Sequence, residues 1–485
     1  MLLGDLAADL ILPDGAGAID ITGITADSRL VAPGFLFAAL PGTATDGARF
    51  VGEAVGRGAV AVLAGIEASL NGATSVPVLR ADDPRRALAR IAARYYPLQP
   101  EHVVAATGTS GKTSVADFVR QIFVAAGKAS ASIGTLGVIT GLRRERGQLT
   151  TPDVVGLHAE LARLAIDGVT HVGLEASSHG LDQRRLDGLR IEAAAFTNLG
   201  RDHLDYHPNV EAYFAAKLRL FTDILPANGA AVVAMDGARA EDIAAAARSR
   251  GQRLIGVGTA GEEIRLLALK PDGLRQRVRV NAFARDYDVA LPLAGAFQAT
   301  NALVAAGLAI AAGIPVDEAL DALAGLRGPP GRLEYAGRRT NGAMIFVDYA
   351  HKPEALATVL QALRPLAGGR LIALFGAGGD RDPGKRSMMG EAAAANADVV
   401  IVTDDNPRSE DPAAIRNAVL AGAPDAIEIG DRGEAIAQAI VMLGPVDVLC
   451  IAGKGHETGQ IIGNRVVPFS DMDQVADVLA AEGAR

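Results

Sequence analysis

The chain alternates short runs of consecutive apolar residues with longer segments in which apolar residues recur every three or four positions. Continuous apolar runs are typical of strands that are buried on both faces of a parallel sheet, and the longer spacing is typical of the helices that cover such a sheet. The pattern therefore predicts an α/β protein. Glycine- and proline-rich breaks divide it into three groups of elements.

Residues 1–92 are predicted to form a small α/β domain that has no phosphate-binding loop. Its apolar runs are Ile19–Ile24, Phe35–Leu40 and Ala59–Leu63. The two prolines of Tyr95–Pro100 discourage a helix on either side, so this segment is interpreted as a linker into the second domain.

Residues 93–328 are predicted to form a second domain, with a parallel sheet that helices cover on both faces. Its first strands are expected at 103–106, His171–Leu174, Ala193–Thr197 and Ala230–Ala234. Near its end the sequence predicts an antiparallel hairpin around a Pro-Asp-Gly turn, followed by one more extended run. These pieces are Ile264–Leu269, Pro271–Gly273, Val278–Phe283 and Tyr287–Leu293.

The strongest break in the chain is Gly-Pro-Pro-Gly at 328–331, because adjacent prolines can continue neither a helix nor a central strand. Residues 329–485 are therefore predicted to form a third, doubly wound Rossmann-like domain. Its strands are expected at Met344–Asp348, Leu371–Phe375, Val399–Thr403, Ala426–Ile429 and Val446–Ala452.

Composition narrows the class of protein. A chain of 485 residues is too long for one core, and the formal net charge of -9 disfavours a general nucleic-acid surface. The single cysteine, Cys450, lies in an apolar run, so it is predicted to be a buried strand residue and excludes an internal disulfide. No run approaches about 18 uncharged apolar residues, and no basic segment precedes the first apolar residues. We therefore expect a cytoplasmic protein without a membrane span.

Residues 107–114, Thr-Gly-Thr-Ser-Gly-Lys-Thr-Ser, join the apolar run at 103–106 to a segment with one apolar helical face. Gly108 and Gly111 allow a tight turn whose N–H groups face an anion, and the helix N-terminus adds partial positive charge. Lys112 would then meet nucleotide phosphates, and Thr113 would hold Mg²⁺. Ala106 stands where the usual pattern has its first glycine, so an ordinary turn with an exposed lysine is the alternative.

Acidic and imidazole side chains follow the next predicted strands of this domain. Glu175 comes directly after His171–Leu174, where a nucleotide-bound Mg²⁺ needs a hard oxygen ligand, although a solvated glutamate is the alternative. His203 and His207 are candidate metal ligands or structural hydrogen-bonding groups. Lys217, by contrast, would be placed on the surface by any residue-level rule.

In the third domain, Arg381 and Arg408 each follow a predicted strand. Because a guanidinium group binds a carboxylate through two parallel hydrogen bonds, this pair suggests an anionic or zwitterionic small molecule. Glu457, after the run that ends at Ala452, could hold an ammonium group. The Gly-x-Gly-x-x-Arg sequence at 376–381 lacks the third glycine of a dinucleotide fingerprint, which weakens an NAD interpretation.

Over all three domains the chain resembles the Mur ligase family. The matching motifs are T-G-T-x-G-K-[ST] at 107–114, E-x-S-S-H-G at 175–180, R-D-H-L-D-Y-H at 201–207 and D-Y-A-H at 348–351. Asp-Ser-Arg at 27–29, with Pro-Gly at 33–34 and Asp-Gly at 46–47, resembles the uridine-diphosphate domain of the member that adds the third peptide residue. Asp-Asn-Pro-Arg at 405–408 resembles that member's signature for meso-diaminopimelate, and lysine-adding relatives usually differ at Arg408.

This resemblance implies an ATP-dependent, amide-forming ligase that adds meso-diaminopimelate to UDP-N-acetylmuramoyl-L-alanyl-D-glutamate through an acyl phosphate. It implies a role in cytoplasmic synthesis of peptidoglycan precursors, with ATP as co-substrate, two Mg²⁺ ions as cofactors and no nucleic-acid partner. The implied domains are a UDP-sugar-binding domain at 1–92, an ATP-binding domain at 93–328 and an amino-acid-binding domain at 329–485. We expect a monomer.

The resemblance also implies site residues, position by position. The implied catalytic residues are Lys112, Glu175, His203 and Lys217. The implied metal contacts are Thr113, Glu175, His203 and Lys217, the last after CO₂ has converted it to a carbamate, N6-carboxylysine. The implied ATP contacts are Gly108, Thr109, Ser110, Gly111, Lys112, Thr113, Ser114, Asn301, Arg332 and Asp348, with Ser110 replacing a common asparagine. The implied contacts to the UDP-muramoyl-dipeptide are Ser28, Thr150, Thr151, Ser177, Gln183 and Arg185, and those to diaminopimelate are Arg381, Asp405, Asn406, Arg408, Gly453 and Glu457.

Other functions stay open at this point. Within the family, a ligase that adds lysine or another diamino acid is the first alternative, and folate polyglutamylation is a more remote one. Outside the family, the phosphate loop would suit a P-loop switch or motor, and the third domain would suit a nicotinamide-dependent oxidoreductase.

Overall fold

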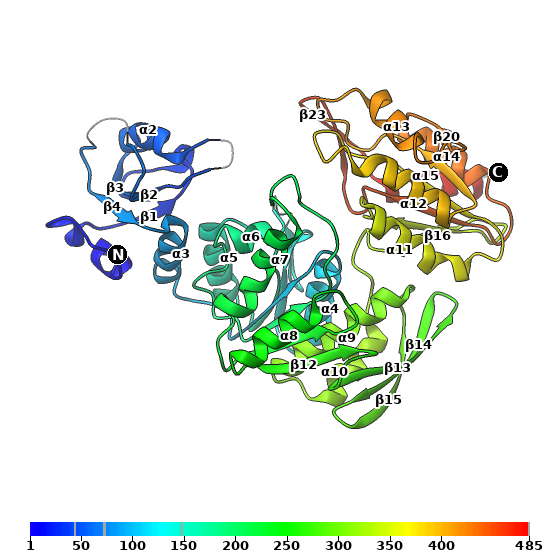
Figure 1. The fold of residues 1–485 in the computed structure, drawn as a ribbon, viewed down its shortest axis with the longest axis horizontal. Helices are drawn as coiled ribbons and strands as arrows, with labels where there is room; N and C mark the ends of the chain where they lie inside the picture. The colour runs from blue at the N-terminus through cyan, green and yellow to red at the C-terminus, as the bar shows by residue number, and fades with distance from the viewer. Residues whose placement is uncertain (43–44, 71–73, 146, 148, 484–485) are drawn as a thin grey trace.

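The computed structural model describes residues 1–42, 45–70, 74–145, 147 and 149–483. They form three α/β domains that follow one another along the chain, with the N-terminal domain in blue on the left of Figure 1 and the C-terminal domain in yellow to red on the upper right. None of the helices in these ranges has the length and apolar character needed to cross a membrane.

The N-terminal domain is a four-stranded parallel sheet in the order β1-β2-β3-β4. Its strands are β1 Gly23–Thr25, β2 Phe35–Ala39, β3 Ala59–Gly65 and β4 Val78–Ala81, and its helices are α1 Leu3–Leu6, η1 Ala16–Ala18, η2 Ser28–Leu30, η3 Gly47–Phe50, α2 Val51–Gly56 and α3 Pro84–Tyr95. The apolar run Ile19–Ile24 enters strand β1 only at its end. Ile19 ends the helical turn η1 and Asp20 pairs with Leu2, so only the last residues enter the sheet.

The central domain has an eleven-stranded sheet in the order β15-β14-β13-β12-β11-β10-β5-β9-β6-β7-β8. The strands from β13 to β6 run parallel, and antiparallel pairing extends the sheet from β13 to β14 and β15 at one edge and from β6 to β7 and β8 at the other. The predicted hairpin is present as β13 and β14. The bounds are β5 His102–Thr107, β6 Ser130–Gly134, β7 Gly137–Ile139, β8 Arg144–Glu145, β9 His171–Glu175, β10 Ala193–Phe196, β11 Ala230–Ala234, β12 Arg253–Gly258, β13 Ile264–Asp272, β14 Arg275–Ala282 and β15 Arg285–Leu291.

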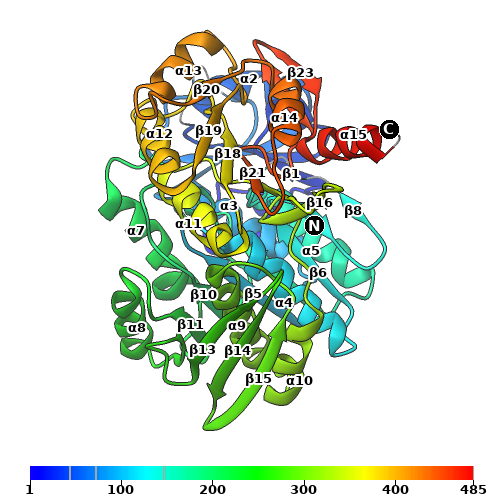
Figure 2. The ribbon, with the colours of Figure 1, turned by 90° about the vertical axis from the view of Figure 1, so that its right-hand side faces the viewer.

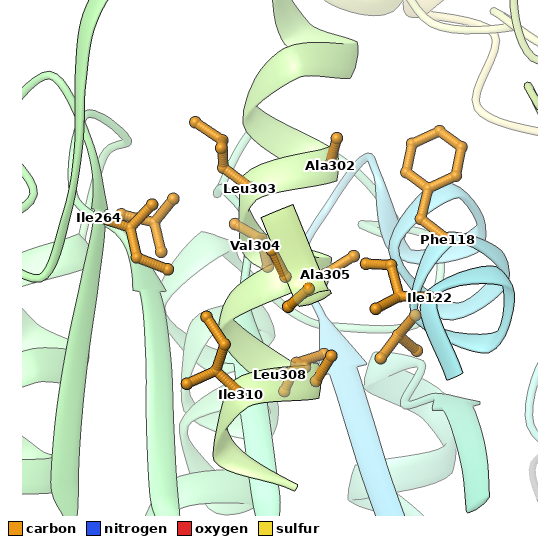
Figure 3. Packing of buried hydrophobic residues seen from close by; sticks show 14 of the residues in the cluster. Phe118, Ile122, Ile264, Ala302, Leu303, Val304, Ala305, Leu308 and Ile310 are labelled. Atoms are coloured by element: carbon orange, nitrogen blue, oxygen red, sulfur yellow. The ribbon is translucent and has the colours of Figure 1, made fainter. Parts of the chain in front are cut away.

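Helices cover both faces of this sheet. They are α4 Lys112–Ala125, α5 Val154–Ile166, α6 Ser178–Asp182, α7 Val210–Arg219, η4 Leu220–Ile224, α8 Ala240–Ser249, α9 Ala296–Ala311, α10 Val316–Asp321 and η5 Ala322–Gly325. The apolar helix α9 is almost wholly buried, with Ile122 of α4 on one side and Ile264 of β13 on the other (Figure 3). Each such buried side chain contributes about 1.5–3 kcal/mol, which fixes α9 against the phosphate-loop helix.

The C-terminal domain has a six-stranded sheet in the order β16-β17-β21-β18-β19-β20, parallel except for β16, and a separate hairpin of β22 and β23. α11, α12 and α13 pack on one face, and α14 and α15 on the other, which confirms the doubly wound prediction. The bounds are β16 Glu334–Arg338, β17 Met344–Asp348, α11 Pro353–Leu363, η6 Arg364–Leu366, β18 Leu371–Phe375, α12 Lys385–Asn396, β19 Val399–Val402, α13 Pro412–Leu420, β20 Ile427–Glu428, α14 Arg432–Val441, β21 Val448–Ala452, β22 Gly459–Ile462, β23 Arg465–Pro468 and α15 Asp471–Gly483.

Connectivity in this sheet creates a crevice. The chain leaves β18 toward β19 on one side, and β21 returns to pair with the other edge of β18. The loops after β18 and β21 therefore separate at a topological switch point, where open α/β sheets bind ligands. Cys450 is buried in β21, as predicted.

A buried histidine generates a prediction about acid stability. His158 on α5 has no exposed surface, and burial lowers its pKa from 6.5 to about 4, although a contact with the Asp187 carbonyl opposes this shift. Between pH 6.5 and about 4 the unfolded chain binds a proton that the folded chain does not, so the free energy of unfolding falls as the pH decreases through this window. We expect His158→Gln to remove about 2–3 kcal/mol of this acid dependence. Urea denaturation followed by circular dichroism at several pH values measures it, and identical pH slopes for the variant and the wild type would contradict it.

Candidate active site

A cavity of about 640 Å³ lies between the central and C-terminal domains. Its walls are the loops that follow β5, β9 and β10, one face of α9, the loop after β17, and α11. In both views α11 faces the central domain (Figures 1 and 2). The cavity is therefore built from the carboxyl ends of parallel strands that belong to two different sheets.

The loop between β5 and α4 has the conformation expected of a phosphate-binding loop. Gly108 and Gly111 have φ values of +147° and +89°. A Cβ atom at Gly108 would lie 1.9 Å from Thr197 Oγ1, and one at Gly111 would lie 2.5 Å from Asn301 Oδ1, so both positions require glycine. Ala106 lies inside β5 and not in the turn, which explains why alanine is accommodated where the usual pattern has glycine.

Two lysine ammonium groups donate to one carbonyl of this loop. Lys112 Nζ and Lys217 Nζ each lie 2.8 Å from the Gly108 oxygen. Burial, followed by the charge of Lys352, lowers the pKa of Lys112 to about 8. Burial, followed by the charge of Lys112, lowers the pKa of Lys217 well below its usual range. Cations this close together favour an anion between them.

Lys217 is not a surface residue, so the residue-level expectation is wrong. Its side chain is 1% exposed, and Nζ lies 4.3 Å from the centre of the Tyr213 ring. Tyr213 is itself fully buried and precedes Lys217 by one helical turn of α7. Residues four apart share one face of a helix, so the spacing to a buried tyrosine was the available signal.

Glu175 ends β9 and is 2% exposed, which excludes the solvated alternative. Its carboxylate accepts hydrogen bonds from the Thr113 hydroxyl at 3.0 Å and from the Thr135 N–H at 2.8 Å. Burial raises its pKa, and the charge of Lys112 opposes this shift. Hydroxyl and carboxylate oxygens are the hard donors that Mg²⁺ prefers, so Thr113 and Glu175 fit a magnesium ion beside the phosphate loop.

His203 lies in the same cavity, with Nε2 3.0 Å from Asp202 Oδ2. Burial lowers its pKa to about 3, so the imidazole is neutral, which is the form that binds a metal. His207 is buried against Tyr213, and its Nε2 has no hydrogen-bond partner among the described residues. Within the described ranges, no group of three or more acidic, histidine or cysteine side chains is arranged as a metal site.

The three expected nucleotide contacts outside the loop come together from separate elements. Asn301 projects from α9 toward Gly111. Arg332 crosses the domain boundary, and its Nη2 donates to Thr113 Oγ1 at 3.2 Å. Asp348, at the end of β17, accepts two backbone N–H groups, and burial raises its pKa to about 6. All three residues line the cavity.

A second cavity of about 540 Å³ adjoins the first, and Asp202, His203 and Lys352 line both. It lies at the switch point of the C-terminal sheet. Its lining contains all six residues expected to contact diaminopimelate: Arg381, Asp405, Asn406, Arg408, Gly453 and Glu457. Arg408 has a φ of +53° and donates to the Gly379 carbonyl at 2.7 Å.

The residues expected to contact the muramoyl-dipeptide are divided between two places. Thr150, Thr151, Ser177 and Arg185 line the second cavity. Arg185 donates to the Thr151 carbonyl at 2.6 Å and to Gln183 Oε1 at 2.8 Å, which ties Gln183 to the same group. Ser28 lies in the N-terminal domain, where its hydroxyl donates to Glu53 at 3.1 Å, outside the lining of both cavities.

Thr135, Tyr349 and Lys352 line these cavities although they were not among the expected site residues. Thr135 follows β6, a strand that the apolar pattern did not reveal. Tyr349 lies under the Arg332 guanidinium group at 4.5 Å, and Lys352 forms an ion pair with Asp202 across the domain boundary at 2.5 Å. Tyr349 lies inside the motif at 348–351 and Lys352 follows it directly, and these positions were the available signal.

Over most of its length the chain is similar to known proteins of one family. Sequence models match residues 20–96 (Mur ligase family, catalytic domain), 106–309 (Mur ligase middle domain) and 331–455 (Mur ligase, glutamate ligase domain). UDP-N-acetylmuramoyl-L-alanyl-D-glutamate--2,6-diaminopimelate ligase of Brucella melitensis is 54% identical over 471 residues, 97% of this chain and 96% of the relative. The protein of the same name from Bradyrhizobium diazoefficiens is 54% identical over the full length of both chains.

Comparison with solved structures gives the same result as comparison of sequences. A structure of a protein with that same name is 32% identical, has a TM-score of 0.72 and covers 100% of this chain and 99% of its own. MurF ligase of Thermotoga maritima in complex with ADP, 20% identical, shares the fold with a TM-score of 0.64, over 96% of this chain and 98% of its own. The chain therefore belongs to the Mur ligase family.

Proposed function

We propose that the protein is an ATP-dependent ligase that joins meso-diaminopimelate to UDP-N-acetylmuramoyl-L-alanyl-D-glutamate in the synthesis of peptidoglycan precursors. The names of full-length relatives at 54% identity support this activity. The observation that carries it is the continuity of the two cavities. An anion-binding loop opens into a space whose far wall holds Arg381 and Arg408, so that a carboxylate activated in one cavity could meet an amine held in the other.

The chemistry needs activation because a carboxylate resists attack by an amine. ATP would phosphorylate the γ-carboxylate of the D-glutamyl group, the diaminopimelate amine would attack the resulting acyl phosphate, and the tetrahedral intermediate would expel phosphate. In such reactions the protein contributes mainly positioning and electrostatic stabilisation.

Each part of the first cavity has a role in this scheme. Lys112 and the loop N–H groups would hold the phosphates, and Asn301, Arg332 and Asp348 would bind the rest of the nucleotide. Mg²⁺, held by Thr113, Glu175 and His203, would reduce the repulsion between phosphate and carboxylate. Because Arg332 and Asp348 come from the C-terminal domain, closure of the domains completes the site.

Lys217 would act as a carbamate. Its depressed pKa favours the free amine, which is the form that attacks the carbon of CO₂ and then loses a proton, and the product would replace a cation with an oxygen ligand for a second metal ion.

We assign the parts of the substrates to the three domains as follows. Residues 1–92, with Ser28, would hold the uridine diphosphate. Residues 93–328 would hold ATP and, through Thr150, Thr151, Ser177, Gln183 and Arg185, the muramoyl-dipeptide. Residues 329–485 would hold diaminopimelate. The enzyme would work as a monomer in the cytoplasm.

A ligation panel tests the function. Purified protein is given ATP, Mg²⁺ and UDP-MurNAc-dipeptide with meso-diaminopimelate, L-lysine, L-ornithine or glutamate, and both phosphate release and product are measured. We expect release that depends on both co-substrates, with meso-diaminopimelate as the preferred acceptor. Release without an acceptor would favour a nucleotide switch, and preference for lysine would overturn the choice of amino acid.

Removal of one arginine should separate amino-acid binding from nucleotide binding. We expect Arg408→Ala to weaken diaminopimelate binding by about 1.5–3 kcal/mol, roughly ten- to hundredfold in KM, because a charge-assisted pair with a carboxylate is lost. The KM for ATP should stay unchanged. Arg248→Ala, which alters an exposed ion pair, is the matched control. An unchanged KM for diaminopimelate would refute the role of Arg408.

Substitution of the buried lysine tests the carbamate. We expect Lys217→Ala to lower kcat by about 100-fold, because loss of a group that supports a bound metal ion lowers the activity of other metal-dependent enzymes by up to this factor. Formate or acetate should restore part of the activity. Lys128→Ala, at an exposed position, is the control. Full activity of Lys217→Ala, or a loss that no carboxylate restores, would argue against the modification.

A further inference from the structure

Lys454 is a charged side chain that has no exposed surface and lies behind the amino-acid cavity. It follows β21 between Gly453 and Gly455, whose φ values of +111° and +53° turn the chain inward. An ammonium group loses its hydration on burial, so it is stable there only where acceptors replace the water. The acceptors of Lys454 therefore indicate its role.

Those acceptors are two residues of the cavity wall. Lys454 Nζ donates to Glu457 Oε2 at 2.9 Å and to Asn406 Oδ1 at 3.2 Å. Asn406 Nδ2 donates to the same glutamate oxygen at 2.9 Å, and the Ile461 N–H donates to Asn406 Oδ1 at 2.8 Å. Because an ammonium group can only donate, it dictates which way the Asn406 amide faces.

This network leaves one oxygen of Glu457 available. Oε2 accepts both hydrogen bonds, whereas Oε1 has no partner among the residues that the structure describes. The Glu457 side chain is 31% exposed and lines the cavity. Oε1 is thus the atom that can receive an ammonium group from a bound molecule.

A second carboxyl group makes the positive charge of Lys454 necessary. Asp405 lines the same cavity, and burial raises its pKa, while Arg432 and Lys454 oppose this shift and Glu457 adds to it. Two carboxyl groups in one cavity repel each other, and Glu457 is the more exposed of the two. Without Lys454, the Glu457 carboxylate would have a lower free energy if it turned away from Asp405 and toward solvent.

We propose that Lys454 is a positioning residue for the acceptor amino acid, which it serves by fixing Glu457 and Asn406 so that the free oxygen of Glu457 receives an ammonium group. The inference rests on the proposed function, since it requires an amino acid in this cavity. It differs from a purely structural role, in which Lys454 would stabilise the fold and affect all substrates alike.

Steady-state kinetics of Lys454→Met tests the proposal, because methionine preserves the length of the side chain and removes the charge and the donor. We expect the KM for meso-diaminopimelate to rise at least about tenfold, while the KM values for ATP and UDP-MurNAc-dipeptide stay within about twofold. Lys454→Arg, which keeps the charge, should lie between Lys454→Met and the wild type. Lys270→Met, at an exposed position of β13, is the matched control.

A double-mutant cycle adds an independent readout. The double variant Lys454→Met/Glu457→Gln should change the binding free energy calculated from the KM for diaminopimelate by less than the sum of the two single variants. The reason is that both substitutions disrupt one network. If Lys454→Met does not fold, Lys454→Gln replaces it in the same double-mutant cycle, because glutamine retains a hydrogen-bond donor and disturbs the fold less.

Two outcomes would overturn the proposal: an unchanged KM for diaminopimelate in a folded Lys454 variant, or an equal rise in KM for all three substrates. Failure of the wild-type protein to ligate diaminopimelate would count against the proposed function instead, so the two failures are distinguishable.

Discussion

The carboxyl ends of two parallel sheets face the same space, and the rest of the structure depends on this arrangement. Strands that run in one direction collect their following loops at one edge of the sheet. β5, β9 and β10 supply such loops from the central domain, and β17, β18, β19 and β21 supply them from the C-terminal domain. Where the two edges meet, Arg332 reaches Thr113 and Lys352 reaches Asp202, so nucleotide and amino-acid sites share one boundary.

Burial of charge is concentrated at these edges. Glu175, Lys217 and Lys454 have almost no exposed surface, and each is held by hydrogen bonds from or to a loop that follows a strand. Arg432 and Asp471 form a fully buried ion pair at 2.7 Å, and Arg432 also donates to the carbonyl at the end of β21. Such groups add little to stability when paired, but loss of one partner is costly, so they fix the geometry of the loops.

The apolar pattern revealed most precisely those strands that are continuous runs of apolar residues. β11, β17 and β18 were predicted to the residue because each is a continuous apolar run in the middle of a sheet. β16, β22 and β23 were missed because edge strands and hairpins are largely exposed, and their mixed residues give no continuous run. The apolar run Ile19–Ile24 enters the sheet only at its end, because Asp20 pairs with Leu2 and no local pattern shows this pairing.

The sequence by itself determined the phosphate loop, the three-part α/β plan and the acidic and basic groups that follow the strands, because turn residues and runs of apolar residues are local features of the sequence. Only the tertiary structure decided which strand ends are neighbours. The placement of β9 between β5 and β6 brings Glu175 to Thr113, and the return of β21 to β18 brings Glu457 to Asn406. It also decided that Lys217 and Lys454 are buried, because the environment of a lysine depends on distant segments that pack over it.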